Sequence, residues 1–272
     1  MMIWILILLL VLLALWLFLI APSLQRSHAL KELCRWNYAH RGLHNIEKGI
    51  PENSLLAFRL AKEKGYAIEL DVHLSKDGKL VVEHDDTLLR TCGSPLTIEE
   101  NEWSAIKNLK LEGTEEHLPL LEEVLALIDG AVPLLIEAKV AKGSAYPLAA
   151  ALADQLSDYH GPYCIESFDP RPLCWLKKNA PAILRGQLAA HVKKDGAKIS
   201  SLTDFALANL LVHLLSRPHF IAYSYKDRKN ISFRLCRALF GSPIFFWTIR
   251  DESAKAIAKE CGATPIFEKI SY

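Results

Sequence analysis

The chain has 272 residues, 51% of them hydrophobic, and its 32 lysines and arginines nearly balance 31 aspartates and glutamates, for a formal net charge of +1. This length and apolar content suffice for one large core and fit a single-domain α/β barrel. The six cysteines form no CxxC pair and no zinc-type spacing, and no repeat of aromatic and basic residues is present. We therefore exclude a zinc-finger protein and expect no nucleic-acid partner.

The first 21 residues contain no charged or strongly polar side chain. An apolar run of about 20 residues matches the thickness of a bilayer core, so we predict a transmembrane helix over residues 1–21. A tether over 22–35 and a barrel domain over 36–272 would follow. The alternative is a cleaved signal peptide, which requires a basic n-region, a shorter apolar core and a small-residue cleavage site. None of these is clear in the sequence.

Basic residues follow the apolar segment, at Arg26, Lys31 and Arg35. Because lysine and arginine near a span favour the cytoplasmic side, we expect a single-pass protein of the cell membrane with a cytoplasmic domain. Residues 171–239 also carry 13 basic and 3 acidic side chains. If these charges gather on one face, that face would attract anionic lipid headgroups, and the alternative is an ordinary solvated helix surface.

The rest of the chain alternates strand-like and helix-like segments, which indicates a parallel sheet with helical crossovers. The strand candidates are residues 37–40, 67–73, 80–84, 133–139, 163–168, 183–188, 219–223, 244–249 and 264–268. Helical patterns cover 54–64, 120–128, 146–157, 203–215 and 252–260. Nine strands are one too many for an eight-stranded barrel, and the sequence does not show which lies outside. Residues 93–117 form a long insertion, which in a barrel usually builds part of the substrate site.

Two strand candidates carry charged residues at a spacing of two, which places their side chains on one face. Glu69 and Asp71 repel each other, and a cation between them would remove that repulsion. Oxygen ligands suit Mg²⁺, Ca²⁺ or Mn²⁺ better than zinc. Glu137 could supply a third ligand and Lys139 a phosphate contact. The alternative for this second pair is a buried Glu-Lys ion pair.

His84 ends the third strand candidate, thirteen positions after Asp71, and Asp77-Gly78 gives a turn signal between them. If Asp71 and His84 lie at one mouth of a barrel, the chain must descend and return within these residues. Six extended residues cover about 20 Å, roughly the height of a barrel, so the path needs no helix. We therefore predict that the crossover helix between these two strands is missing.

Short motifs follow one another along the chain in a specific order. They are His40-Arg41-Gly42, Pro51-Glu52-Asn53-Ser54, Glu69-Leu70-Asp71-Val72, Lys76-Asp77-Gly78 and Val81-Val82-Glu83-His84-Asp85. Each is weak alone, since a lone histidine after a strand is more often structural than catalytic. Together, in this order and spacing, they resemble the glycerophosphodiester phosphodiesterase family. The resemblance continues through residues 118–125, 136–139, 167–168 and 246–249, and so spans most of 37–250.

This resemblance implies a TIM (β/α)8 barrel and a metal-dependent hydrolase that cleaves glycerophosphodiesters to glycerol 3-phosphate and an alcohol. The family's motifs assign roles to ten positions. The cation ligands would be Glu69, Asp71 and Glu137, and the acid/base pair would be His40 and His84. Arg41 and Lys139 would contact phosphate, Glu52 and Asn53 would organise the site, and Trp247 would form an aromatic wall beside the substrate. The alternative for Trp247 is a core tryptophan.

The chain departs from the family pattern at the substrate pocket. Arg250 stands where the family usually has asparagine, and Pro265-Ile266-Phe267-Glu268 stands where an Asp-containing motif is usual. The alternatives to the glycerophosphodiesterase are a lysophospholipase D-type activity on lysolipids and a non-catalytic membrane-bound sensor. Retention of every expected ligand disfavours the sensor. The sequence leaves the metal, the alcohol group and the oligomeric state open.

Overall fold

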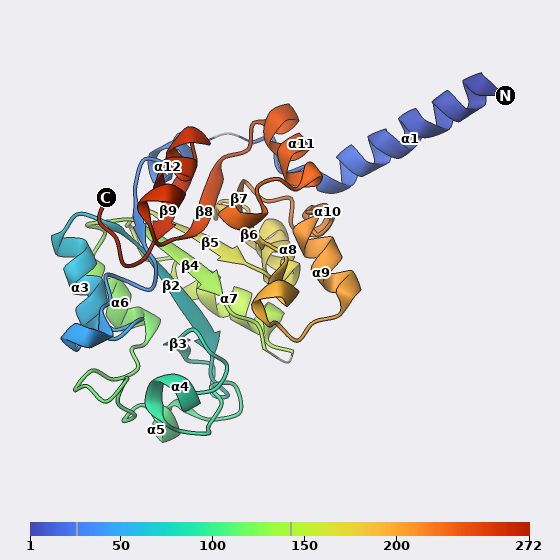
Figure 1. Ribbon diagram of the computed structural model, residues 1–272. Helices are drawn as coiled ribbons and strands as arrows, with labels where there is room; N and C mark the ends of the chain where they lie inside the picture. Colours follow the sequence, from blue (N-terminus) through green and yellow to red (C-terminus); the bar gives the residue numbers. More distant parts are fainter. Residues whose placement is uncertain (26, 142) are drawn as a thin grey trace.

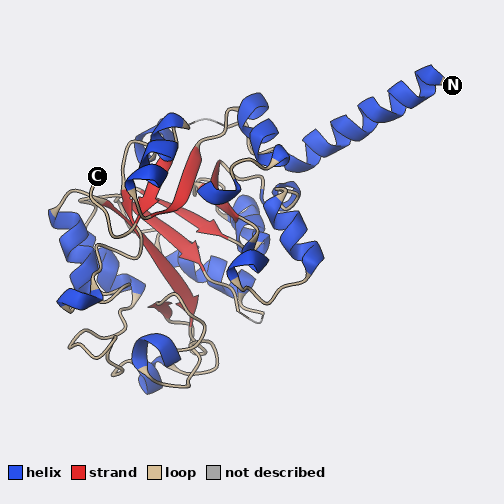
Figure 2. Cartoon of the chain, viewed as in Figure 1, coloured by secondary structure: helices blue, strands red, loops and turns tan. Residues whose placement is uncertain are grey.

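Eight parallel strands form a closed barrel in the computed structural model, which describes residues 1–25, 27–141 and 143–272. Each strand pairs with the next in the order β1, β2, β4, β5, β6, β7, β8, β9, and β9 pairs with β1 to close the barrel. Figures 1 and 2 show this sheet inside its helices. The strands are β1 (Tyr38–Ala39), β2 (Ala67–Leu74), β4 (Leu134–Ala138), β5 (Tyr163–Ser167), β6 (Arg185–Ala189), β7 (Phe220–Ser224), β8 (Ile244–Ile249) and β9 (Thr264–Phe267). The predicted TIM barrel is confirmed.

The ninth strand, β3 (Leu80–Val82), lies outside the barrel and pairs antiparallel with the end of β2. The turn between them is closed by Gly78, whose backbone N–H donates to the Ser75 carbonyl and whose φ is +81°. The predicted absence of a crossover helix between these strands is confirmed, but the predicted path is wrong. The chain overshoots the barrel mouth along β2 and returns along β3, because the last residues of β2 pair with β3 rather than with a barrel strand.

Helices follow the barrel strands and cover the outside of the sheet (Figure 1). They are α3 (Leu55–Glu63), α6 (Leu121–Ile128), α7 (Ala145–Gln155), α8 (Pro170–Asn179), α9 (Ser201–Ala208), α10 (His213–Ser216), α11 (Ile231–Phe240) and α12 (Glu252–Glu260). Short 3₁₀ turns are η1 (Ile46–Lys48), η2 (Val192–Asp195) and η3 (Tyr225–Asp227). Side chains cap several helices: the Ser54 hydroxyl, for example, accepts from the Ala57 N–H at 3.1 Å, and α3 begins directly after it, within the helical pattern predicted over 54–64.

The single helix predicted over 203–215 is wrong, because the chain forms two helices there. Leu210 adopts a left-handed conformation with a φ of +60°, and the Leu211 N–H donates to the Ala206 carbonyl. These are the features of a helix C-terminus, and they end α9 before α10 begins. The break lets α10 pack against α8 and α1.

The N-terminal end of the barrel is plugged by α2 (His28–Leu33), which lies within the predicted tether. Its Leu30 and Leu33 are buried in an inner cluster with Tyr38, Phe220 and other residues at the strand starts. The Tyr38 hydroxyl donates to the Leu33 carbonyl at 3.0 Å. The opposite end of the barrel therefore remains as the open mouth, where TIM barrels place their active sites.

The insertion after β3 builds a small core of its own with α4 (Leu89–Cys92) and α5 (Trp103–Ile106). Its buried side chains include Leu88, Ile98, Ile106 and Leu118. The residues that line the main pocket come from other segments of the chain. Residues 93–117 bury apolar side chains against each other and do not line this pocket, so their expected part in the substrate site stays a prediction.

The N-terminal helix α1 (Met2–Ile20) projects from the barrel (Figure 1). Within the described residues it is the only helix long and apolar enough to cross a membrane. Most of its side chains are exposed, yet its last residue, Ile20, is completely buried in the barrel's outer core. The helix thus ends inside the folded domain. Arg26, which the sequence places in the basic flank, lies outside the described residues.

Candidate active site

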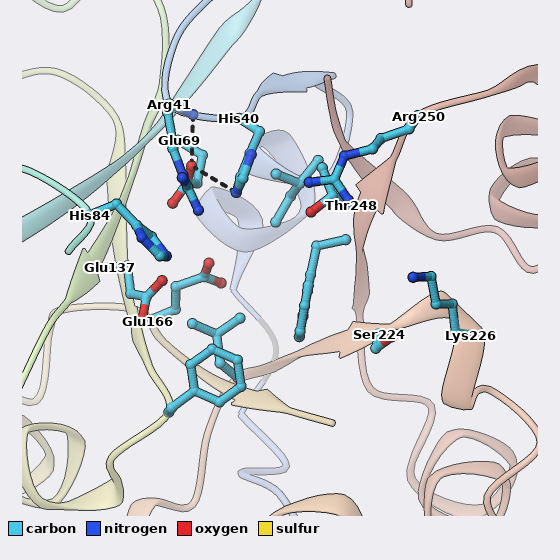
Figure 3. Close-up of a pocket in the computed structure, with 14 residues that line it drawn as sticks. His40, Arg41, Glu69, His84, Glu137, Glu166, Ser224, Lys226, Thr248 and Arg250 are labelled. Atoms are coloured by element: carbon cyan, nitrogen blue, oxygen red, sulfur yellow. Dashed lines mark hydrogen bonds and ion pairs between the residues drawn. The ribbon is translucent and has the colours of Figure 1, made fainter. Parts of the chain in front are cut away.

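A pocket of about 310 Å³ opens at the carboxyl ends of the barrel strands. Figure 3 shows its lining, in which predicted residues and unpredicted ones meet. The lining contains His40, Arg41, Glu69, His84, Glu137, Glu166, Phe168, Leu188, Ser224, Lys226, Trp247, Thr248, Arg250 and Ile266. Residues far apart in the sequence converge here because they lie in the barrel strands or in the segments that follow strands near one edge of the closed sheet.

Three carboxylates lie together at one side of the pocket. Glu69 and Asp71 project from β2, and Glu137 is the register neighbour of Asp71 on β4. One oxygen from each lies within 4.8 Å of the others, and all three side chains are buried. The alternation of side chains along the strands therefore produces the cluster that the sequence predicts. Hard oxygen donors at this separation fit a divalent cation such as Mg²⁺, Ca²⁺ or Mn²⁺.

Burial and the neighbouring charges shift the pKa values of these carboxyl groups. Burial raises the pKa of Glu69 well above its usual value, and the charges of Asp71 and Glu137 raise it further. Burial acts on Asp71 in the same direction, but the charges of Lys139, His84 and Arg41 hold its pKa well below the usual range. A cation between the carboxylates would relieve the repulsion that raises the pKa of Glu69.

Lys139 lies against these carboxylates, with Nζ 3.2 Å from Glu137 Oε1 and 3.5 Å from Asp71 Oδ1. The Glu-Lys ion pair that the sequence left as an alternative is therefore present. Burial would lower the pKa of Lys139, but Glu137 and Asp71 raise it above its usual value. The ammonium stays charged and contributes positive charge next to the carboxylate cluster.

Arg41, in the turn after β1, and Asn53, just before α3, lie next to the same cluster, and the Asn53 N–H donates to the Arg41 carbonyl at 3.0 Å. The Arg41 N–H donates to Glu69 Oε2 at 2.9 Å, and Asn53 Nδ2 donates to Asp71 Oδ2 at 2.9 Å. Both residues have positive φ, near +50°. At Gly42 a Cβ atom would come within 2.9 Å of Ala57 and of the next residue in α3, so only glycine fits there. This backbone orients the carboxylates through Arg41 and Asn53.

His40 lies between two acids. Its Nδ1 is 3.2 Å from Glu268 Oε2, and its Nε2 is 4.0 Å from Glu69 Oε2. Burial lowers the pKa of the His40 imidazole to about 4, although the hydrogen bond to Glu268 acts in the opposite direction. Arg250 in turn donates to Glu268 Oε2 from Nη2 at 3.0 Å and from Nε at 3.2 Å.

His84 stands on the other side of the cluster and is held by a chain of charged groups. Its Nδ1 lies 2.6 Å from Asp85 Oδ1, and Arg90 Nε donates to Asp85 Oδ2 at 2.6 Å. Arg90 Nη2 and Arg41 Nη1 both donate to Glu52 Oε1 at 2.7 Å. The hydrogen bond from His84 holds the pKa of Asp85 well below its usual range. Glu52 therefore links the surroundings of the two histidines.

Sequence reasoning assigned no role to several of these residues. Asp85 follows His84 directly in a quoted motif, which is a signal that could have identified it. Glu166 is 1% exposed, has a buried Oε2 with no hydrogen-bond partner among the described residues, and is the register neighbour of Glu137. Burial and then the charge of Glu69 raise the pKa of Glu166 well above its usual value.

Trp247 lines the pocket from β8 and meets Phe168 edge to face, with ring centroids 5.6 Å apart. Its position fits the predicted aromatic wall, since the ring is only partly buried and faces the cavity. A core tryptophan would be enclosed on all sides.

Comparison with known proteins agrees with this geometry. A glycerophosphodiester phosphodiesterase of Caldanaerobacter subterraneus is 36% identical over 163 residues, which cover 55% of this chain and 65% of that protein. A lysophospholipase D of Rattus norvegicus is 24% identical over 281 residues, covering 90% of this chain and 86% of that protein. This chain thus aligns with less than two thirds of the length of the Caldanaerobacter relative.

The fold also matches solved structures. An Oleispira antarctica phosphodiesterase in complex with the product sn-glycerol-3-phosphate superposes with a TM-score of 0.70 at 25% identity, covering 86% of this chain and 92% of that one. The sequence model of the glycerophosphoryl diester phosphodiesterase family matches residues 40–268. This range holds the whole barrel mouth, from His40 to Glu268. The chain therefore belongs to the glycerophosphoryl diester phosphodiesterase family.

Proposed function

We propose that this protein is a metal-dependent enzyme that hydrolyses glycerophosphodiesters to glycerol 3-phosphate and an alcohol. The observation that carries the proposal is the pair of histidines, His40 and His84, that point into one pocket beside a buried carboxylate cluster (Figure 3). The Oleispira antarctica relative, whose structure contains sn-glycerol-3-phosphate, supports this substrate class.

Glu69, Asp71 and Glu137 would hold one divalent cation, for which Mg²⁺, Ca²⁺ and Mn²⁺ are the candidates. When bound, the cation supplies positive charge that withdraws electrons from the phosphate and stabilises its transition state. Arg41 lines the pocket and Lys139 lies beside the cluster, so both add positive charge for the phosphate. Glu52 and Asn53 hold Arg41 and Asp71 in place, and Trp247 forms one wall.

The hydrogen bonds of the two histidines indicate where their protons lie. Glu268 is bound by Arg250 and, as a carboxylate, can only accept, so the neutral His40 carries its proton on Nδ1. Its Nε2 is then free to accept a proton from the nucleophile. His84 donates from Nδ1 to Asp85, and as the general acid it would be the imidazolium, whose second proton on Nε2 passes to the leaving alcohol.

A lysophospholipase D-type activity is the second candidate, because the rat relative carries that name and α1 would hold the pocket close to lipid. The two substrates differ only in an acyl chain on the glycerol. The same cluster and histidines would act on both.

The contacts of α1 support an uncleaved anchor. His213 Nδ1 lies 2.8 Å from the Ile20 carbonyl, and Arg217 Nη1 donates to the Phe18 and Ala21 carbonyls at 2.8 and 2.7 Å. Trp16 Nε1 donates to the Ser232 hydroxyl at 3.2 Å. Removal of the helix would leave the buried Nδ1 of His213 without the Ile20 carbonyl, at a cost in stability.

The surface around the exit of α1 suits a bilayer. Apolar side chains on α9, α10 and α11 are exposed, namely Leu202, Phe205, Leu214, Leu215, Ile231 and Leu239. Two of these helices, α10 and α11, contact α1 directly. The basic residues Arg217, Arg234 and Arg237 lie on the same helices or at their ends. We therefore propose a single-pass membrane protein whose barrel rests on the cytoplasmic leaflet.

One experiment tests the activity. The purified full-length protein is incubated with a panel of glycerophosphodiesters and lysolipids, with each divalent metal and with chelator. Release of glycerol 3-phosphate from the diesters supports the proposal. Turnover of lysolipids alone would assign the lysophospholipase D activity, and a metal-loaded protein that turns over neither class would favour the non-catalytic sensor.

A further inference from the structure

Two opposite walls of the pocket differ in the charged side chains that their strands contribute. Glu69, Glu137 and Glu166 come from the neighbouring strands β2, β4 and β5. The opposite wall comes from the ends of β7 and β8, and the ionisable side chains that it adds to the lining are Lys226 and Arg250. Figure 3 shows both of them directing their nitrogen atoms into the pocket.

These two cations retain positive charge for a ligand. Asp227 lies next to Lys226 in the chain, but its two oxygens are engaged elsewhere, by the His191 N–H at 2.9 Å and by Lys194 Nζ at 3.5 Å. Arg250 is bound to Glu268, yet its side chain is 51% exposed and its bonds to Glu268 use only Nε and Nη2. Because Arg250 carries five N–H donors, others remain for a ligand.

The chemistry of the substrate indicates what this wall binds. In the proposed reaction the scissile phosphate is met by the carboxylate-bound cation, Arg41 and Lys139, on the acidic side. The glycerol arm of a glycerophosphodiester carries only hydroxyl groups. A further negative charge can therefore lie only on the alcohol. Resting on the proposed function, we propose that Lys226 and Arg250 form a subsite for an anionic group, a phosphate or a carboxylate, on the alcohol.

The same wall disfavours a cationic alcohol. Trp247 lines the same pocket from β8, three positions before Arg250 in the chain, and a tryptophan face alone would attract the quaternary ammonium of choline. Two cations beside it repel that group by Coulomb's law. The enzyme's preferred substrates are thus glycerophosphodiesters with an anionic alcohol, ahead of those with choline or ethanolamine.

A matched pair of substrates tests the subsite in the full-length, metal-loaded protein. Glycerophosphoglycerol has a neutral alcohol, and bis(glycerophospho)glycerol has the same alcohol with one added phosphodiester. We expect kcat/KM to favour the second compound, and Lys226→Met to reduce this preference about tenfold, the scale of one partly solvated charge-assisted contact. Lys229→Met is the control, since Lys229 lines a different surface pocket, and it leaves the preference unchanged. An unchanged preference in Lys226→Met would overturn the subsite.

Arg250 needs a second measurement because it also holds Glu268. Arg250→Met reduces kcat for every substrate through His40, and we expect an additional rise in KM for bis(glycerophospho)glycerol alone. A loss of kcat/KM that is equal for both substrates would show that Arg250 only positions Glu268 and is not part of the subsite.

Failure of the subsite and failure of the proposed function give different results. Calorimetric titration of the His84→Ala protein with both compounds measures binding while turnover is slow. Tighter binding of bis(glycerophospho)glycerol that is lost on adding Lys226→Met supports the subsite even if the wild-type protein hydrolyses neither compound. Turnover of both compounds with equal binding overturns the subsite and leaves the proposed function intact.

Discussion

At the residue scale, the two histidines carry the sharpest prediction. Each has its Nδ1 held by a carboxylate, Glu268 for His40 and Asp85 for His84, so each presents Nε2 to the pocket. We expect His40→Ala or His84→Ala to reduce kcat about 100-fold or more, the scale of losing a positioned proton-transfer group. The wild-type rate should depend on pH with a bell shape, because one histidine must accept a proton while the other donates one.

His117→Ala is the control for both variants, since this side chain is 46% exposed and lies outside the pocket. His73 is unsuitable as a control because it lies in β2 itself, is buried, and has its Nε2 3.3 Å from the His84 carbonyl. Circular dichroism checks that each variant folds. Near wild-type turnover in a folded, metal-loaded His40→Ala or His84→Ala protein would refute the acid/base pair.

At the scale of elements, the adjacent strands β2 and β4 concentrate three buried carboxylates. We expect chelator to abolish activity and Mg²⁺, Ca²⁺ or Mn²⁺ to restore it. We also expect Glu69→Gln to raise the Tm of the metal-free protein, because the substitution removes a repelled charge and keeps an oxygen that can accept from Arg41. The same variant should lose the rise in Tm on adding metal.

The outcome that contradicts this prediction is full activity in a chelated, metal-free preparation. A metal-induced rise in Tm that persists in Glu69→Gln would remove Glu69 from the ligand set. Asn108→Ala provides a control, since Asn108 lines a separate surface pocket beside the insertion and should leave both measurements unchanged.

The contact of α1 with His213 in the barrel domain should make the stability of the protein depend on pH. Burial lowers the pKa of His213 to about 4 from an ordinary value of 6.5, despite its bond to the Ile20 carbonyl. The unfolded chain therefore binds a proton at a higher pH than the folded protein does. Stability from this group is complete above the unfolded pKa and is lost as pH falls through 6.5 toward 4.

We expect His213 to lower the free energy of unfolding by about 2 kcal/mol when the pH falls from about 7.5 to about 5. The measurement is chemical unfolding of the full-length protein in detergent at both pH values. His213→Gln keeps a donor for Ile20 without titrating, so its loss of stability over this range should be smaller than that of the wild-type protein. Equal losses in the two proteins would show that His213 is not the group responsible.

At the scale of the whole molecule, the membrane topology follows from the charges around α1. Lys31 and Arg35 follow the span, and the basic ends of α10 and α11 lie beside it. We expect a reporter fused after Tyr272 to be active in the cytoplasm, because positive charge next to a span is retained on that side. A reporter that is active only outside the cytoplasm would reverse the orientation.

The sequence by itself determined the local chemistry of the site. Side chains two positions apart on a strand share a face whatever the rest of the fold does, which is why the spacing alone pairs Glu69 with Asp71. The alternation of strands and helices is local in the same sense. It predicts a parallel sheet with helical crossovers, and the short interval from Asp71 to His84 predicts the missing helix between β2 and β3.

The tertiary structure decided everything that depends on closure of the barrel. Glu268 meets His40 across 228 positions because β9 pairs with β1, and Arg90 reaches Glu52 across 38 positions because the insertion folds on its own core. Neither contact leaves a periodic signal in the chain. The position of β3 outside the barrel, the wall of Lys226 and Arg250, and the docking of α1 on His213 likewise arise from long-range packing, which short-range backbone preferences do not specify.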